Sequence, residues 1–429
     1  MRMRCVVELQ YLSALAEAGL FPALSPEESS RLQQGLSSFT DGDFDRIKEI
    51  ETGINHDVKA CEIFLRERLN LANPSMIHFG LTSEDVNNLA CSRLLAAFVI
   101  NEQLPLLERL LRALCDKIAA WRDVAFPART HGQKASPSTL GKEMAVFVER
   151  LLRQYCVLST VRFRGKFFGA TGTGAAWREA FPAFDWLTFS REFMAGMGLE
   201  PALATTQVED HDSWASYFAA VNLVNSIVRD LDIDIWLYQT LGYLVEQPKD
   251  AEVGSSTMPH KVNPIRFENS EGNLHVADAL LTMMARELTH SRLQRDLSGS
   301  TVIRNVGVAL AHSHLAWHQT LEGLARLQVR ADRCAEDLAA SPELLAEPIQ
   351  TILKTAGATD PYEAMRRLTQ GRAVSETDMR GFVESLDVAE PFKSRLRELR
   401  LSSYTGYAGE ICDRVRAAAR EALGPEERS

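Results

Sequence analysis

The stretch most unusual in its chemistry is GSSTMPHKVNP, which runs from Gly254 to Pro264. It places two serines, a threonine, a histidine, a lysine and an asparagine between two segments with helical patterns. Gly254 permits unusual backbone conformations, and the following residues offer hydroxyls and backbone N–H groups. Lys261 and Asn263 then add a cation and an amide at the start of the next predicted helix. This combination is typical of an anion-binding site at a helix N-terminus.

Three other segments concentrate polar side chains between predicted helices. Loops held by a rigid scaffold are common places for binding and catalysis. Each segment also fits a purely structural role: Thr82 to Asp85 could cap a helix, His131 could end one, and Asn55 to Asp57 could form a turn. The segments are ETGINHDVKA (51–60), HFGLTSEDVNN (78–88) and RTHGQKASPST (129–139).

Composition excludes several classes of protein. The chain has 429 residues, 45% of them hydrophobic, and a formal charge of -10, which argues against a general binder of nucleic acids or acidic membranes. No apolar run approaches 18 residues, so we predict no membrane span, and Glu8, Gln10 and Ser13 break the N-terminal run that a signal peptide would need. Seven scattered cysteines without a CxxC pair are typical of the buried thiols of a cytosolic protein, so we predict a cytoplasmic location.

Hydrophobic periodicity predicts an all-α fold. Between residues 213 and 247, apolar or small residues recur at alternating spacings of four and three, which indicates a long helix in an elongated bundle. The only short, ambiguous strand pattern covers 161–168. We predict an N-terminal helical domain at 1–77, a central long-helix bundle at 78–330 and a C-terminal helical domain at 331–429. Further long helices are predicted at 84–121, 138–167, 263–295 and 301–328.

Two patterns that resemble cofactor sites have simpler interpretations. The glycine-rich segment 169–174 follows no strand of a βαβ unit and ends in no Gly-Lys-Thr/Ser, so it predicts no nucleotide fold. His314 and His318 are spaced like helical metal ligands, but no glutamate follows the first of them as in HExxH. We therefore predict that both histidines are bundle residues.

The motifs together resemble a known family. Residues 254–264 match every fixed position of GSSxMPxKxNP, the signature of the fumarase/aspartase superfamily of lyases. Within it, the chain resembles the adenylosuccinate lyase family, in its bacterial long form, from about Val6 to Tyr407. The segments that carry this closer resemblance are NHDVKA (55–60), TSEDVNN, RTHGQ, TTQVEDHD (205–212), QRDLSGSTVIRN (294–305) and LAEPIQT (345–351).

The resemblance implies a reaction and a set of roles. Members of this family release fumarate by β-elimination from adenylosuccinate, giving AMP, and from succinylaminoimidazole carboxamide ribotide (SAICAR). The resemblance implies that Ser255 is the base, with Ser256 as the alternative, and that His131 is the acid. Lys261 and Asn263 would bind the succinyl carboxylates with help from Thr82 and Ser83. The residues implicated in binding the nucleotide and its phosphate are Asn55, His56, Asp57, Gln207, Arg295, Ser300 and Arg304.

The resemblance further implies a homotetramer whose active sites are shared between subunits, small-molecule nucleotide substrates, and no metal or organic cofactor. The sequence departs from its relatives at the start, because it lacks an upstream Ser-Pro-x-Asp-Gly-Arg-Tyr motif that helps to bind phosphate. We expect that this segment is missing upstream of Met1. The alternatives are another fumarate-releasing lyase of the superfamily and a catalytically silent structural homologue. A serine hydrolase is disfavoured because no strand and GxSxG elbow precede the serines.

Overall fold

The computed structural model describes residues 1–247, 258, 261–371 and 374–425. These residues are mostly helical, which confirms the predicted all-α class and long-helix bundle. They fall into two compact units, which the following paragraphs describe separately. Unit 1 consists of Met1–Pro105, Val157–Asn222 and Ala277–Ala311, and unit 2 of Leu106–Cys156, Leu223–Val276 and His312–Ser429.

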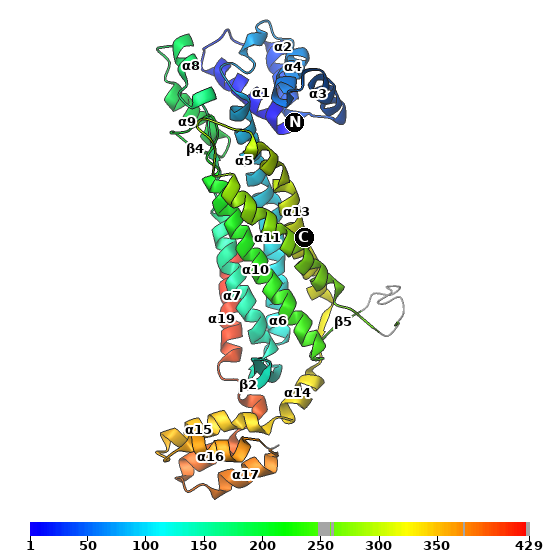
Figure 1. The fold of residues 1–429 in the computed structure, drawn as a ribbon, viewed down its shortest axis with the longest axis vertical. Coiled ribbons are helices and arrows are strands. Elements are labelled where there is room, and N and C mark those ends of the chain that lie inside the picture. Colours follow the sequence, from blue (N-terminus) through cyan, green and yellow to red (C-terminus); the bar gives the residue numbers. More distant parts are fainter. Residues whose placement is uncertain (248–257, 259–260, 372–373, 426–429) are drawn as a thin grey trace. The chain divides into compact units, whose positions relative to one another are not determined.

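Unit 1 is built around α5 (Ser83–Phe98), which packs against α1 (Arg2–Glu17) (Figure 1). Apolar residues of α1 to α4 form one buried cluster, which includes Leu9, Leu32, Ile47 and Phe64. The remaining elements of this unit are α2 (Pro26–Ser37), α3 (Asp41–Ile54), α4 (Asp57–Leu69), η1 (Pro74–Met76), η2 (Val99–Gln103), β3 (Arg164–Gly165), η3 (Gly169–Thr171), α8 (Ala175–Ala180), α9 (Trp186–Gly196), β4 (Glu200–Pro201), α12 (Ser298–Val302) and η4 (Ile303–Asn305).

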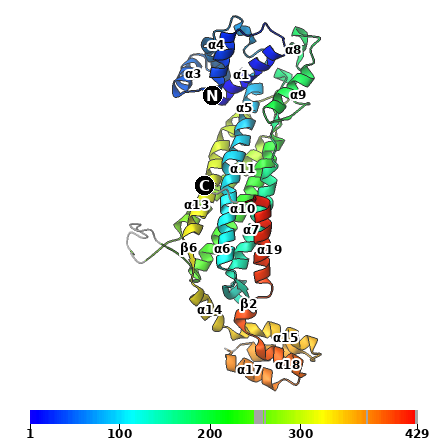
Figure 2. The same cartoon turned by 180° about the vertical axis from the view of Figure 1, so that it is seen from behind.

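In unit 2, α6 (Leu104–Ala120) and α19 (Ala408–Leu423) run beside parts of α7 (Leu140–Ser159) and α10 (Asp212–Thr240) (Figures 1 and 2). A second apolar cluster, which includes Ile349, Met379 and Val383, lies among the C-terminal helices. The other elements are β1 (Ala125–Thr130), β2 (Gln133–Thr139), β5 (Leu244–Glu246), β6 (Leu327–Val329), α14 (Ala331–Ala339), η5 (Pro342–Leu345), α15 (Ala346–Thr355), α16 (Pro361–Thr369), α17 (Glu376–Ser385), α18 (Glu390–Glu398) and η6 (Leu401–Ser403).

Besides α6, whose first two residues belong to unit 1, four long helices contribute residues to both units. The predicted heptad seam is buried along α10, where Val224, Val228, Leu231 and Ile235 are fully covered. The predicted extension of this helix to residue 247 is wrong, because α10 ends at Thr240 and a strand follows a left-handed glycine turn. The four helices are α7 (Leu140–Ser159), α10 (Asp212–Thr240), α11 (Ile265–Glu287) and α13 (Val306–Arg326).

The described strands form three small two-stranded pairs, β1 with β2, β3 with β4 and β5 with β6. The segment 129–139, predicted as a connection between helices, belongs to the antiparallel hairpin of β1 and β2. The sequence gives no sign of this hairpin, because Pro127 and Pro137 interrupt any alternating pattern, and these two prolines face each other in it. The boundaries of the three predicted domains remain a prediction.

Candidate active site

The N-terminus of α5 carries Thr82 and Ser83, two of the predicted substrate-binding residues. Thr82 is the N-cap, and the carboxylate of Asp85 accepts hydrogen bonds from the Thr82 backbone N–H at 2.8 Å and from its hydroxyl at 2.9 Å. The structural interpretation of this segment as a helix cap is therefore confirmed. The N-terminus of this 16-residue helix also carries backbone N–H groups and the positive end of the helix dipole. Both features favour the binding of an anion at Thr82 and Ser83.

A fully buried ion pair lies beneath this helix start. The Nζ of Lys166 is 2.6 Å from a carboxylate oxygen of Asp85, and neither side chain has any exposed surface. Lys166 also donates to the carbonyl of Gly169 at 2.7 Å, and the Gly169 N–H donates back to Asp85. The glycine-rich segment that begins at Gly169 thus packs against the cap of α5. No sequence pattern had marked Lys166.

Replacing Lys166 with methionine should destabilise the protein by about 3–5 kcal/mol, because it leaves the Asp85 carboxylate buried without its cation. The measurement is the urea midpoint at one fixed protein concentration. The matched control is Lys48→Met, which breaks the exposed Lys48–Glu51 pair of 2.6 Å and should cost about 1 kcal/mol or less. Equal decreases of the urea midpoint in the two variants would contradict the prediction, because the buried pair would then stabilise the protein no more than the exposed one.

The segment Asn55 to Asp57 lies against the start of α5. Asn55 ends α3 in a left-handed conformation, and His56 caps α4 by accepting the Lys59 N–H on Nδ1 at 3.0 Å. In a neutral ring the proton is then on Nε2, which lies 3.4 Å from the hydroxyl of Ser83. Asp57 is held by Arg4 at 2.8 Å. The structure therefore brings two predicted groups together, the 55–57 segment and the Thr82–Ser83 cap.

A further contact chain extends this cluster to Arg295 and Gln207. The guanidinium of Arg295 lies 3.7 Å from the Glu84 carboxylate and donates to the Gln207 side-chain oxygen at 3.0 Å. Burial raises the pKa of Glu84 to about 7, although Arg295 opposes this shift. In the sequence, Glu84 stands out only as part of the Thr82–Asp85 cap, and no motif indicates its contact with Arg295.

Ser300 and Arg304 follow Arg295 closely in the sequence, but neither makes a described contact with this cluster. The Ser300 hydroxyl, on α12, donates to the Leu297 carbonyl at 2.7 Å. Arg304, on η4, is exposed and makes no ion pair with any carboxylate that the structure describes. Its guanidinium is therefore available for a ligand as far as the described residues show.

His131 belongs to unit 2, at the tip of the β1–β2 hairpin. His131 and Gly132 form the two-residue turn, with φ of 53° and 74°, and Thr130 pairs with Gln133 across it. Two positive φ angles are typical of a type I′ turn, which matches the twist of the flanking strands. The structural alternative of a helix-end histidine is wrong. The exposed His131 side chain stands on a turn with positive φ, a left-handed conformation in which histidine is more frequent than most residues other than glycine.

Residues 258 and 261–264 of the signature loop are among those that the structure describes. Ser255, the predicted base, and Ser256 lie outside the described residues. Lys261 is exposed, its N–H donates to the Met258 carbonyl at 3.0 Å, and Asn263 lies two residues before the first residue of α11. Pro264 comes just before the first residue of α11, close to the predicted first-turn position. Lys261 and Asn263 thus lie just before the start of a helix, and their role in binding an anion stays a prediction.

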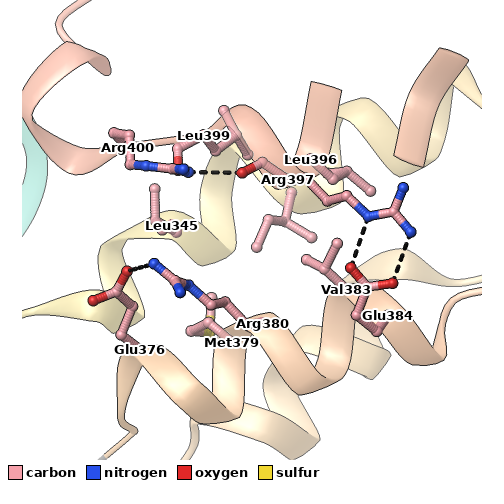
Figure 3. Close-up of a pocket in the computed structure, with 11 residues that line it drawn as sticks. Leu345, Glu376, Met379, Arg380, Val383, Glu384, Leu396, Arg397, Leu399 and Arg400 are labelled. Carbon is pink, nitrogen blue, oxygen red and sulfur yellow. Dashed lines mark hydrogen bonds and ion pairs between the residues drawn. The ribbon is translucent and has the colours of Figure 1, made fainter. Parts of the chain in front are cut away.

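A separate recess of about 370 Å³ lies among α15, α17 and α18 (Figure 3). Its arginines are engaged within the protein: Arg380 pairs with Glu376 at 2.5 Å, and Arg397 pairs with Glu384 at 2.7 Å. Arg400 donates to two backbone carbonyls of its own segment. No predicted site residue lines this recess, so we assign it no part in the site.

Within the described part of the chain, no group of His, Cys, Asp and Glu side chains could hold a metal ion. None of the described helices is both long and apolar enough to cross a membrane. All seven cysteines are free, and those at 5, 61, 334 and 412 are buried, whereas Cys156 is exposed, which differs from the buried thiols expected of it.

Comparisons with known proteins identify the family. A family model described as lyase matches residues 3–277, and one described as adenylosuccinate lyase C-terminal matches residues 291–405. The chain is 42% identical to the adenylosuccinate lyase of Vibrio cholerae and 40% identical to that of Escherichia coli, in both cases over 97% of this chain and 93% of the relative. The adenylosuccinate lyase of Dictyostelium discoideum is 39% identical, over 94% of this chain and 91% of the relative.

Solved structures agree with this assignment at the level of the fold. A fumarate lyase from a Mesorhizobium species superposes with a TM-score of 0.78 at 20% identity, over 97% of this chain and 95% of the other. A 3-carboxy-cis,cis-muconate lactonizing enzyme from Pseudomonas putida gives 0.78 at 19% identity, over 99% and 95%. The chain therefore belongs to the adenylosuccinate lyase family of the fumarase/aspartase superfamily.

Proposed function

We propose that this protein releases fumarate from adenylosuccinate, giving AMP, and from SAICAR. The observation that carries the proposal is the contact chain at the start of α5. There the His56 ring faces Ser83, and Glu84 leads through Arg295 to Gln207. The helix N-terminus and the arginine suit the binding of an anion. The amide and imidazole groups beside them suit hydrogen bonds to a nucleobase or a ribose.

In this reaction one residue removes a proton from carbon and another protonates the departing nitrogen. Ser255, as its alkoxide, removes a proton from the succinyl carbon next to a carboxylate, and the electron pair moves into that carboxylate. Lys261 and Asn263 stabilise the resulting charge, since fixed donors act most strongly where charge develops. The C–N bond then breaks, and His131 gives its proton to the departing nitrogen, which becomes the amino group of AMP or the carboxamide of the product from SAICAR, and fumarate is left.

The test of this function is an NMR assay of product release from each of the two substrates. One fumarate should form for each AMP or each aminoimidazole carboxamide ribotide (AICAR) released. A folded protein that releases fumarate from neither substrate would refute the proposal and favour a different lyase substrate or the structural homologue.

Arg304→Ala should raise the KM for adenylosuccinate by about tenfold or more, because a charge-assisted contact with phosphate contributes about 1.5–3 kcal/mol. The expected kcat is nearly unchanged, since the phosphate lies away from the breaking bond. The matched control is Arg292→Ala, whose side chain is 81% exposed and pairs with Asp296. An unchanged KM for the Arg304 variant would remove Arg304 from the phosphate site.

The assembly that we propose is a homotetramer with active sites shared between subunits. It is supported by a stripe of exposed apolar residues on α10, Leu223, Ile233 and Leu237, which lies away from the buried seam. Sedimentation should give a mass of four chains of 47.8 kDa. A monomer that is fully active would contradict shared sites.

We further propose a cytoplasmic location and no metal or organic cofactor. Elimination next to a carboxylate requires only a base, an acid and fixed charges, and all three kinds of group are available among the proposed residues. Activity that survives prolonged dialysis against a chelator would agree with this proposal, and activity restored only by added metal would contradict it.

A further inference from the structure

The hairpin that carries His131 is poorly suited to hold its own tip in place. It has only two strands, and such a hairpin is marginally stable by itself. Between Pro127 and Arg129 its register shifts, so that one residue of β1 faces two of β2. Contacts from outside the hairpin must therefore fix the direction in which His131 points.

Two cations directly opposite each other add a second weakness. Arg129 and Lys134 are partners across the strands, one position from the turn, and like charges in this arrangement are destabilising. Asp337, from α14, compensates them. Its carboxylate is 2.6 Å from the Nζ of Lys134 and 3.6 Å from the guanidinium of Arg129. The Lys134 ammonium also donates to the Ser341 hydroxyl at 2.7 Å.

The carboxylate oxygen of Asp337 that faces Arg129 also accepts a hydrogen bond from a tyrosine. The buried Tyr243 hydroxyl donates to this oxygen, and the Tyr243 ring packs edge-on against Phe126 of β1, with centroids 5.6 Å apart. Burial and the neighbouring Asp337 raise the pKa of Tyr243 to about 12, so this hydroxyl stays a donor at neutral pH. Burial by itself would raise the pKa of Asp337. The hydrogen bonds from Lys134 and Tyr243 outweigh this effect and keep that pKa below its ordinary value.

Asp337 is thus a carboxylate with only 13% of its side chain exposed, and it joins α14, the segment after α10 and both strands of the hairpin. A second contact, in which Ser136 of β2 donates to Glu347 of α15, ties the hairpin to the same C-terminal region. Arg129 in turn donates to the Gly132 carbonyl at 3.1 Å, within the turn itself. Arg129 therefore links Asp337 to the tip of the hairpin, because it contacts both the Asp337 carboxylate and the Gly132 carbonyl.

We propose that Asp337 is a positioning residue for His131: by neutralising Arg129 and Lys134 it fixes the turn that presents the acid. This inference rests on the proposed function only in taking His131 as that acid. It predicts a loss in the rate of the chemical step, because a small displacement of a catalytic group can cost about 10²-fold. Substrate binding should change little, since Asp337 is not among the proposed binding residues.

Asp337→Asn should lower kcat at least about tenfold while the KM stays within about twofold. Hydrogen exchange of the peptide 125–139, followed by mass spectrometry, should become faster. Asp337→Glu should restore part of the rate, and Tyr243→Phe should produce a smaller loss of the same kind, which keeps the test open if the asparagine variant folds poorly. The control on the same helix is Asp332→Asn, whose carboxylate pairs with Arg330 and is 61% exposed. It should leave both the rate and the exchange unchanged.

The decisive comparison is made in a His131→Asn background. If Asp337 acts through His131, then Asp337→Asn should cause no further loss from the residual rate, whereas an independent structural effect would add to the loss. A kcat within twofold of wild type for Asp337→Asn, or fully additive losses, would overturn the inference. An undiminished rate for His131→Asn alone would instead refute the acid role in the proposed function.

Discussion

His131→Asn should lower kcat for adenylosuccinate by about 10²–10⁴-fold, the contribution typical of a positioned general acid. Without an imidazole, the departing nitrogen must leave unprotonated or wait for a proton from water. The proposed contacts with the nucleotide do not involve His131, so the affinity for adenylosuccinate should remain close to that of the wild type. Steady-state kinetics and equilibrium dialysis give the two quantities.

Asparagine is the informative replacement at this position. The backbone at His131 has φ of 53°, a conformation that asparagine tolerates well, and Asn-Gly is a preferred pair for a type I′ turn. The variant therefore removes the acid while keeping the hairpin. Unchanged hydrogen exchange over residues 125–139 would show that the turn is intact. A rate near that of the wild type would leave the acid unassigned.

Ser255→Ala should lower kcat by a comparable factor of about 10²–10⁴, because no elimination begins until the succinyl proton is removed. The change deletes one oxygen and leaves Lys261, Asn263 and the α5 N-terminus in place. Adenylosuccinate should therefore still bind, and calorimetry on the inactive variant can measure its affinity without turnover.

Ser256→Ala is the matched control for this experiment, since the two serines are adjacent and identical in type. We expect its rate to stay within about threefold of the wild type, as for substitutions away from the reacting atoms. The reverse pattern, with an active Ser255 variant and an inactive Ser256 variant, would move the base role to Ser256.

The long helices could be predicted from sequence because their burial is periodic. Val224, Val228, Leu231 and Ile235 lie at heptad spacing and are all buried in the structure. Helix ends were less predictable where one residue decides them. Gly242 adopts a left-handed conformation just after the end of α10, and no periodic pattern announces such a stop.

The candidate site was predictable where its residues form a contiguous motif, and not where distant residues meet. The Thr82–Asp85 cap and the 55–57 segment are local patterns, and the structure places them side by side. The Lys166–Asp85 pair spans 81 positions and the Lys134–Asp337 pair spans 203. Such pairs depend on tertiary packing, and a lone lysine or aspartate in a helical sequence gives no sign of its partner.

The most direct test of the proposed mechanism separates proton removal from bond cleavage. Adenylosuccinate is incubated in D₂O with each variant, and NMR follows both deuterium entry at the succinyl carbon and release of fumarate. If Ser255 is the base and His131 the acid, His131→Asn should catalyse deuterium entry without matching fumarate release, and Ser255→Ala should catalyse neither. Deuterium entry catalysed by the Ser255 variant would contradict the account, because another group would then be removing the proton.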